Sequence, residues 1–125
     1  IWLYLLLGNR KQKALLEGRV DEARRSLDED AWPDDVRQVN NAIRNQFELP
    51  VLFYLCCLML WALQLVNLFT LVIACAFVFS RFWHAGIQTG SNYVPMRRKI
   101  FTLGAVLLVM LYFLITYRLI LQIAI

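Results

Sequence analysis

Residues 41 to 50 read Asn-Ala-Ile-Arg-Asn-Gln-Phe-Glu-Leu-Pro, and this stretch decides how the chain is arranged. Four polar side chains lie three, four and seven positions apart within it, which places them on one face of a helix: Asn41, Arg44, Asn45 and Glu48. No charged residue follows from Leu49 to Phe79, so this polar face meets a long apolar segment. Charged groups at that depth of a membrane usually face a cavity or a partner, so the face is a candidate site for a charged ligand.

The composition places the chain among small integral membrane proteins. Of its 125 residues, 60% are hydrophobic and 18% are charged, and the mean hydropathy is +0.54. We expect one domain, residues 1–125, in a lipid bilayer. The net charge of +4 does not indicate a nucleic-acid partner, because the basic residues form no patch interleaved with aromatic side chains.

The apolar runs predict an all-α membrane protein, a four-transmembrane-helix bundle whose first helix is truncated in this chain. Gly8 and Asn9 are expected to end the first helix, and a short amphipathic helix is expected after it, between residues 14 and 35. The expected segments are the end of helix one at 1–8, a cytoplasmic connection at 9–32, helix two at 33–63, helix three at 67–90 and helix four at 95–122.

Pro50 lies inside the predicted second helix. A proline in a helix removes one backbone hydrogen bond and tends to kink the helix. We therefore expect a kink near this residue and a free backbone carbonyl near Gln46.

The distribution of Lys and Arg predicts the orientation in the membrane. Of 13 such residues, eight lie between Arg10 and Arg44, four between Arg81 and Lys99, and one is Arg118. The first and third connections are therefore expected in the cytoplasm, with both termini on the far side. The polar face of helix two, the end of helix three and the start of helix four would then meet at one membrane surface.

The end of helix three and the start of helix four supply further polar groups at that surface. Arg81 and His84 lie three positions apart and Gln88 follows four later, again on one helical face. The basic triplet 97–99 (Arg97, Arg98, Lys99) precedes the uncharged run of helix four. Membrane orientation alone explains such a triplet, but a guanidinium at a helix start would also lower the pKa of a bound thiol.

Two interpretations of the first polar face stay open on spacing alone. Arg44 can grip a carboxylate through two hydrogen bonds and Glu48 can accept from an ammonium, which suits a zwitterionic ligand. The alternative is a cluster of salt bridges and hydrogen bonds that ties the helices together. Cys56, Cys57 and Cys75 are expected to be reduced residues of the apolar spans, and no Cys/His spacing indicates a metal site.

Three motifs together resemble the MAPEG family, the membrane-associated proteins of eicosanoid and glutathione metabolism. They are Arg44-Asn45-x-x-Glu48 with Pro50, Arg81-x-x-His84, and Pro95-x-Arg97, over residues 40 to 101. The resemblance implies a homotrimer with a glutathione site between neighbouring subunits, open to the cytoplasm.

The resemblance also implies roles for single residues. Glutathione would be bound by five side chains: Arg44, Asn45, Glu48, Arg81 and His84. Arg97 would be the catalytic residue that stabilises the glutathione thiolate. Asn41, Gln88 and Arg98 are possible supporting residues, but some glutathione-using members carry Arg, Tyr and Ser at these three positions.

The resulting hypothesis is a glutathione-binding transferase or peroxidase, without a metal, that acts on hydrophobic electrophiles. The missing Tyr and Ser hydroxyls make prostaglandin-type isomerase chemistry a poor fit. The alternative is a non-catalytic MAPEG-like accessory subunit of a larger membrane complex. A channel or transporter fits less well, because the polar residues gather at one surface. The motifs are most similar to those of bacterial members, so an inner membrane is expected.

Overall fold

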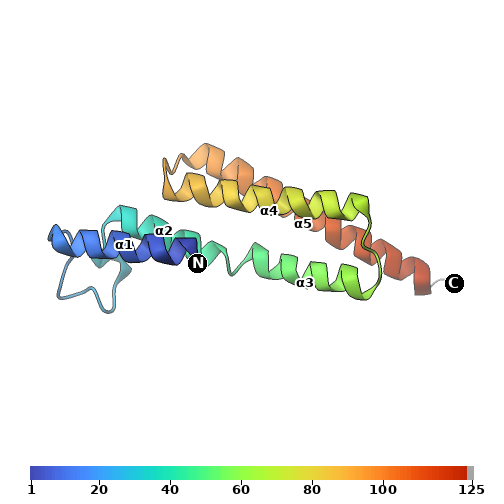
Figure 1. Cartoon of the computed structure of the whole chain (residues 1–125), viewed down its shortest axis with the longest axis horizontal. Helices are drawn as coiled ribbons and strands as arrows, with labels where there is room; N and C mark the ends of the chain where they lie inside the picture. The colour runs from blue at the N-terminus through green and yellow to red at the C-terminus, as the bar shows by residue number, and fades with distance from the viewer. Residues whose placement is uncertain (124–125) are drawn as a thin grey trace.

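The structure, a computed structural model, describes residues 1–123, and in this range it consists of helices and their connections. Figure 1 shows α4 and α5 as a long hairpin, α1 beside α2 at one end of the molecule, and α3 continuing beyond α2. The elements are α1 (Trp2–Leu16), the 3-10 helix η1 (Glu29–Ala31), α2 (Asp34–Asn45), α3 (Leu49–Ala62), α4 (Leu68–Thr89) and α5 (Val94–Ile123).

Three helical segments of the described chain are long and apolar enough to cross a membrane: Asp34–Ala62, Leu68–Thr89 and Val94–Ile123. Their outward faces carry large apolar side chains in the open, such as Phe79, which is 75% exposed, and Trp61, which is 73% exposed. Aliphatic and aromatic side chains over a whole surface suit hydrocarbon rather than water. The predicted all-α membrane fold is confirmed, with α1 as a shorter helix of 15 residues.

Helix α1 continues past the point where the sequence predicts its end. Gly8 and Asn9 are helical, and the helix reaches Leu16, so the connection is shorter than residues 9–32. One glycine costs a helix only about 1 kcal/mol, and the following residues are good helix formers. The helix ends at Leu16, just before Gly18, whose φ of +65° is left-handed and would be strained in any residue with a Cβ. Turns and η1 follow, instead of the amphipathic helix expected at 14–35.

The predicted second helix is broken rather than kinked. Helix α2 ends at Asn45 and α3 begins at Leu49. Pro50 has no N–H to donate to the carbonyl of Gln46, and the chain tightens into bonds from Gln46 to Ile43 and from Phe47 to Arg44. The polar face of α2 and Glu48 therefore do not belong to one continuous helix.

The apolar core lies where α3, α4 and α5 meet. Phe53 of α3 stacks on Phe77 of α4 with 4.3 Å between ring centroids, and Leu111 of α5 is fully buried beside them. Asn67 caps α4 by accepting from the backbone of Thr70, which stops the α3–α4 turn at a defined residue. This core joins α3 to the first half of α4 and the second half of α5.

Gly104 allows α4 and α5 to approach closely. A Cβ at this position would lie 2.9 Å from Ser80 Oγ and 3.3 Å from Arg81 Nη1. Ser80 Oγ donates to the carbonyl of Phe77 over 2.7 Å, so the hydroxyl cannot turn away without losing that bond.

We expect Gly104→Ala to destabilise the protein by about 1–3 kcal/mol, the usual cost of overpacking. Denaturant unfolding in detergent measures the change. Because the closest clash involves Ser80 Oγ, the same substitution in a Ser80→Ala background should cost much less. Equal costs in both backgrounds would contradict this account of the helix contact.

Candidate functional site

Helix α2 presents the polar face that the sequence predicts. Asn41 and Arg44 are exposed on this face and Asn45 is partly buried. Asn45 Nδ2 donates to Gln88 Oε1 of α4 over 2.8 Å, so the amide ties the two helices together. Glu48 lies exposed beyond the break and caps nothing with its side chain.

The end of α4 contributes buried polar groups to the same place. His84 is 2% exposed and Gln88 is 3% exposed. The His84 ring packs at a tilt against Phe101 of α5, with 5.6 Å between centroids. Nδ1 of His84 has no hydrogen-bond partner among the described residues, so this atom is available to a bound group.

The start of α5 contributes the basic residues. Arg97 is partly buried, and its Nη1 donates to Asn92 Oδ1 in the preceding loop over 2.5 Å. Arg98 is exposed beside it. A helix start carries partial positive charge from its free N–H groups, so the guanidinium groups and the backbone attract an anion together.

These three elements enclose a groove of about 520 Å³, which we call the polar groove. Every site residue predicted from the sequence except Arg81 lines it. Val94 and Phe101 add apolar wall. The complete lining is Asn41, Arg44, Asn45, Glu48, His84, Gln88, Val94, Arg97, Arg98 and Phe101.

Arg81 lies in a different place from the one predicted. Its side chain is buried, 6% exposed, and it lines a second pocket on the other side of α4. Its guanidinium carbon lies 5.2 Å from the centroid of the Phe101 ring, which separates it from the polar groove. The sequence could not show this, because three positions along a helix turn the side chain by about 60° from His84.

Glu29 is a polar-groove neighbour that the sequence analysis missed. Its Oε1 accepts from Arg44 Nη2 over 2.5 Å and from Asn40 Nδ2 over 2.8 Å. In the sequence, Glu29 is one of several acidic residues between α1 and α2, and nothing distinguishes it from the others. The carboxylate of Glu29, in η1, therefore already pairs with the Arg44 guanidinium.

The turn before η1 holds Glu29 in this position. Asp28 accepts from the backbone N–H of Asp30 over 2.8 Å and pairs with Arg24. The bond to the Asp30 N–H is the main cause of a lowered Asp28 pKa. Because the folded pKa is lowered, this cap stabilises the turn at neutral pH and is lost as the pH falls through that pKa.

Arg10 is a second missed residue. It donates from Nη1 to the carbonyl of Asp35 and from Nη2 to that of Thr89, both over 2.6 Å. The bonds join α1 to the start of α2 and to the end of α4, so this side chain ties together three helices next to the groove. The sequence analysis missed this role because membrane orientation alone explains a positive charge at Arg10.

The polar groove suits an organic anion with one positive group better than a metal ion. No three His, Cys, Asp or Glu side chains of residues 1–123 gather in a metal-binding arrangement. Its ionisable groups are three guanidinium groups, one carboxylate and one imidazole. Guanidinium groups bind carboxylates in a forked geometry, and Glu48 can accept from an ammonium.

The fold and this groove define a class, the small all-α membrane proteins with a polar ligand groove at the end of their bundle. A family model described as the MAPEG family matches residues 1–117. The chain belongs to that family, as its motifs predict, and so to a membrane family of glutathione and eicosanoid metabolism. No curated protein and no solved structure matched the chain.

Proposed function

We propose that the polar groove binds glutathione and that the protein is a thiol transferase or peroxidase for hydrophobic electrophiles. The observation that supports this most is the meeting of α2, α4 and α5 in one groove with three guanidinium groups and one carboxylate. Glutathione carries two carboxylates, one ammonium group and one thiol. The groups of the groove complement that set of charges.

Each end of glutathione has a partner in this proposal. Arg44 binds a carboxylate, Glu48 the ammonium, and Asn45 and His84 hydrogen-bond the peptide groups. Arg97 faces the thiol from the start of α5. Arg98, Asn41 and Gln88 line the groove and support the ligand.

The chemistry needs only the thiolate and an electrophile. The thiol proton leaves to water, and the thiolate is stabilised by the Arg97 charge. In conjugation the sulfur forms a bond to the electrophilic carbon while the bond to the leaving group breaks. In peroxide reduction the O–O bond breaks and the hydroperoxide becomes an alcohol and water. Two glutathione molecules supply the two electrons and two protons and join through a new S–S bond as glutathione disulfide.

Arg44→Ala is expected to weaken glutathione binding by about 10- to 100-fold. A hydrogen bond to a charged group contributes about 1.5–3 kcal/mol, and Arg44 is the proposed carboxylate grip. Calorimetry on purified protein in lipid nanodiscs measures the affinity. Absence of binding to the unsubstituted protein at millimolar glutathione would rule out the proposal.

Glu29→Gln is the matched variant for this experiment. The Arg44–Glu29 pair is exposed, 62% and 48% at the side chains, so it contributes only about 0–1 kcal/mol. Removing the carboxylate should free Arg44 and tighten glutathione binding by up to about fivefold. Unchanged or weaker binding would show that Glu29 does not compete with the ligand.

The proposal includes an assembly and a location. By its resemblance to the family, the chain forms a homotrimer in which a neighbouring subunit closes the polar groove, in a bacterial inner membrane. The Lys and Arg distribution supports a cytoplasmic groove and termini on the far side. Native mass spectrometry in mild detergent tests the trimer, and a labelling reagent that cannot cross membranes tests the side on which the termini lie.

A second candidate is a non-catalytic accessory subunit of a larger membrane complex. The contact of Glu29 with Arg44 favours it, because a loop carboxylate holds the proposed ligand grip. Gln88 and Arg98 lack the hydroxyl groups that some glutathione-using members have. Copurification with a partner, together with absence of glutathione binding, would support this function over the first.

A further inference from the structure

A small cavity lies at the end of the bundle opposite the polar groove. Figure 1 shows this end, where α3 turns into α4 beside the second half of α5. The cavity has a volume of about 140 Å³, and side chains of α3, the α3–α4 turn, α4 and α5 line it. Most of them are apolar, and Arg118 is the one charged group. This space, which we call the Arg118 cavity, is too small for a drug-sized molecule and suits a single phosphate-sized group.

Arg118 lies at the level of the lipid headgroups. Residues 100–117 of α5 are uncharged and span about 27 Å of helix, close to the hydrocarbon core of about 30 Å. The basic triplet 97–99 precedes this run, so Arg118 marks the opposite membrane surface. Trp61 and Tyr117, both more than half exposed, lie at the same end of the bundle. Such aromatic side chains gather where a membrane meets water.

The chain offers no acidic side chain to Arg118. Its nine Asp and Glu residues all lie between Glu17 and Glu48. Glu48, the last of them, precedes α3, whose 14 residues separate it from the α3–α4 turn by about 21 Å. A second copy of the chain in the same membrane orientation carries its carboxylates at the other surface too. The anion that balances Arg118 therefore comes neither from this chain nor from a copy of it.

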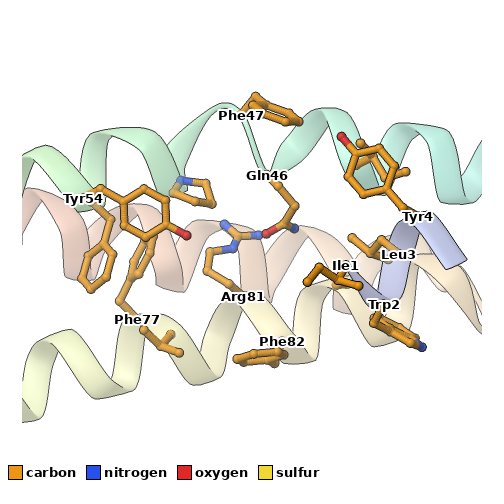
Figure 2. A pocket seen from close by; sticks show the side chains of 15 residues that line it. Ile1, Trp2, Leu3, Tyr4, Gln46, Phe47, Tyr54, Phe77, Arg81 and Phe82 are labelled. Atoms are coloured by element: carbon orange, nitrogen blue, oxygen red, sulfur yellow. The ribbon is translucent and has the colours of Figure 1, made fainter. Parts of the chain in front are cut away.

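Arg81, the other arginine that follows a long apolar run, differs in this respect. Figure 2 shows its guanidinium in the middle of the second pocket, among residues of the α2–α3 break. The Glu48 carboxylate lies at this break and acts on Arg81 through space. Arg118 has no such group at its end of the bundle within residues 1–123.

Asn67 adds a second donor to the Arg118 cavity. Its Nδ2 donates to the carbonyl of Leu65 over 3.3 Å, and its Oδ1 accepts from the backbone of Thr70. An amide NH₂ group carries two hydrogens, so one remains for a ligand. A guanidinium fork and an amide hydrogen together suit the free oxygens of a phosphate group. The aliphatic wall, which includes Leu114, suits the first carbons of acyl chains.

We propose that the Arg118 cavity binds the phosphate group of a two-chain anionic phospholipid. Free phosphate shares the chemistry of the headgroup, but the apolar lining and the position at the membrane surface favour the lipid. Phosphatidylcholine suits the cavity less well, because its cationic group would meet Arg118 without a carboxylate to pair with. The cavity and the polar groove share no residue, so the proposal does not rest on glutathione binding.

Photocrosslinking in phosphatidylcholine vesicles tests the proposal. The probe is a phosphatidylglycerol with a diazirine close to its headgroup, and a phosphatidylcholine with the same diazirine is the reference. We expect the phosphatidylglycerol probe to label residues 60–70 about tenfold more than the reference does, the low end of what a hydrogen bond to a charged group contributes. Equal labelling by the two probes, or loss of the phosphatidylglycerol signal in millimolar inorganic phosphate, would overturn the proposal.

Arg118→Gln should remove this difference, and Arg118→Lys should keep part of it, because lysine keeps the cation without the fork. Lys99→Gln is the matched control: it removes an exposed cation from the other end of α5 and should be labelled as the unsubstituted protein is.

Leu114→Trp fills the cavity and leaves Arg118 in place, so it separates a binding cavity from a cation that only meets headgroups at the surface. We expect this variant to lose the preference as well. A full preference in either Arg118→Gln or Leu114→Trp would overturn the proposal. Thermal unfolding of each variant shows that it is folded.

Discussion

Replacing Arg97 with alanine is expected to lower the rate of glutathione conjugation by about 10²- to 10³-fold, the usual effect of removing one group that stabilises developing negative charge. Arg97 lies partly buried at the start of α5, where the helix dipole adds to its positive charge. In the proposed function this charge keeps bound glutathione in the thiolate form. The thiolate is the nucleophile, so loss of the Arg97 charge slows the reaction and leaves glutathione bound.

Two measurements separate these effects. The ultraviolet absorbance of the thiolate, followed against pH with bound glutathione, should show a lowered thiol pKa in the unsubstituted protein and a normal one in Arg97→Ala. Calorimetry should show that both proteins still bind glutathione. Lys99→Ala is the control, because it removes a cation from the same basic triplet at an exposed position outside the groove.

The position of Arg97 depends on the loop before α5. Asn92 holds the guanidinium through a 2.5 Å bond and has a left-handed φ of 49°. An Arg97→Ala protein with an unchanged thiolate signal would assign thiol activation to another group. His84 and Arg98, which line the same groove, would then be the next residues to substitute.

Replacing Arg81 with methionine is expected to raise the free energy of unfolding by about 1–4 kcal/mol, the range observed when buried ion pairs give way to apolar side chains. The guanidinium is buried, and its three nitrogens lack partners within residues 1–123. Methionine has a similar length and fits the contact with Phe101. Most substitutions destabilise a protein, so a gain at a buried arginine is a specific result.

Denaturant unfolding in uncharged detergent, free of fatty acids and anionic lipids, measures this change. Arg98→Met is the control, since an exposed substitution usually changes stability by less than about 0.5 kcal/mol. A marked loss of stability in Arg81→Met would contradict the unpaired state of Arg81. It would mean that a protein group, such as Glu48 or a residue of a neighbouring subunit, pairs with the guanidinium.

Arg81 and Arg97 occupy similar positions in the sequence pattern but different places in the structure. Arg81 and Arg97 both stand at one end of an apolar run, and both were predicted to serve one ligand. The structure brings Arg97 to the polar groove and turns Arg81 to the opposite side of α4. The Phe101 ring, which lines the groove, lies 5.2 Å from the Arg81 guanidinium carbon.

The sequence by itself determined the class of fold and most of the polar groove. Long uncharged runs must form helices in a bilayer, because no water is present to satisfy the backbone, and polar residues three and four apart must share a helical face. These are local rules, and they place Asn41, Arg44 and Asn45 correctly.

Only the tertiary structure decided where α1 ends, where the second helix breaks and which residues pair with the charged side chains. Helix α1 ends at Leu16, before Gly18, rather than at Gly8, because good helix formers outweigh one glycine until the left-handed Gly18 ends the helix. Glu29 of η1 reaches Arg44 of α2 across 15 positions of the chain, and Arg81 is left without a hydrogen-bond partner within residues 1–123. Such contacts depend on how distant segments pack, and a local pattern carries no information about that packing.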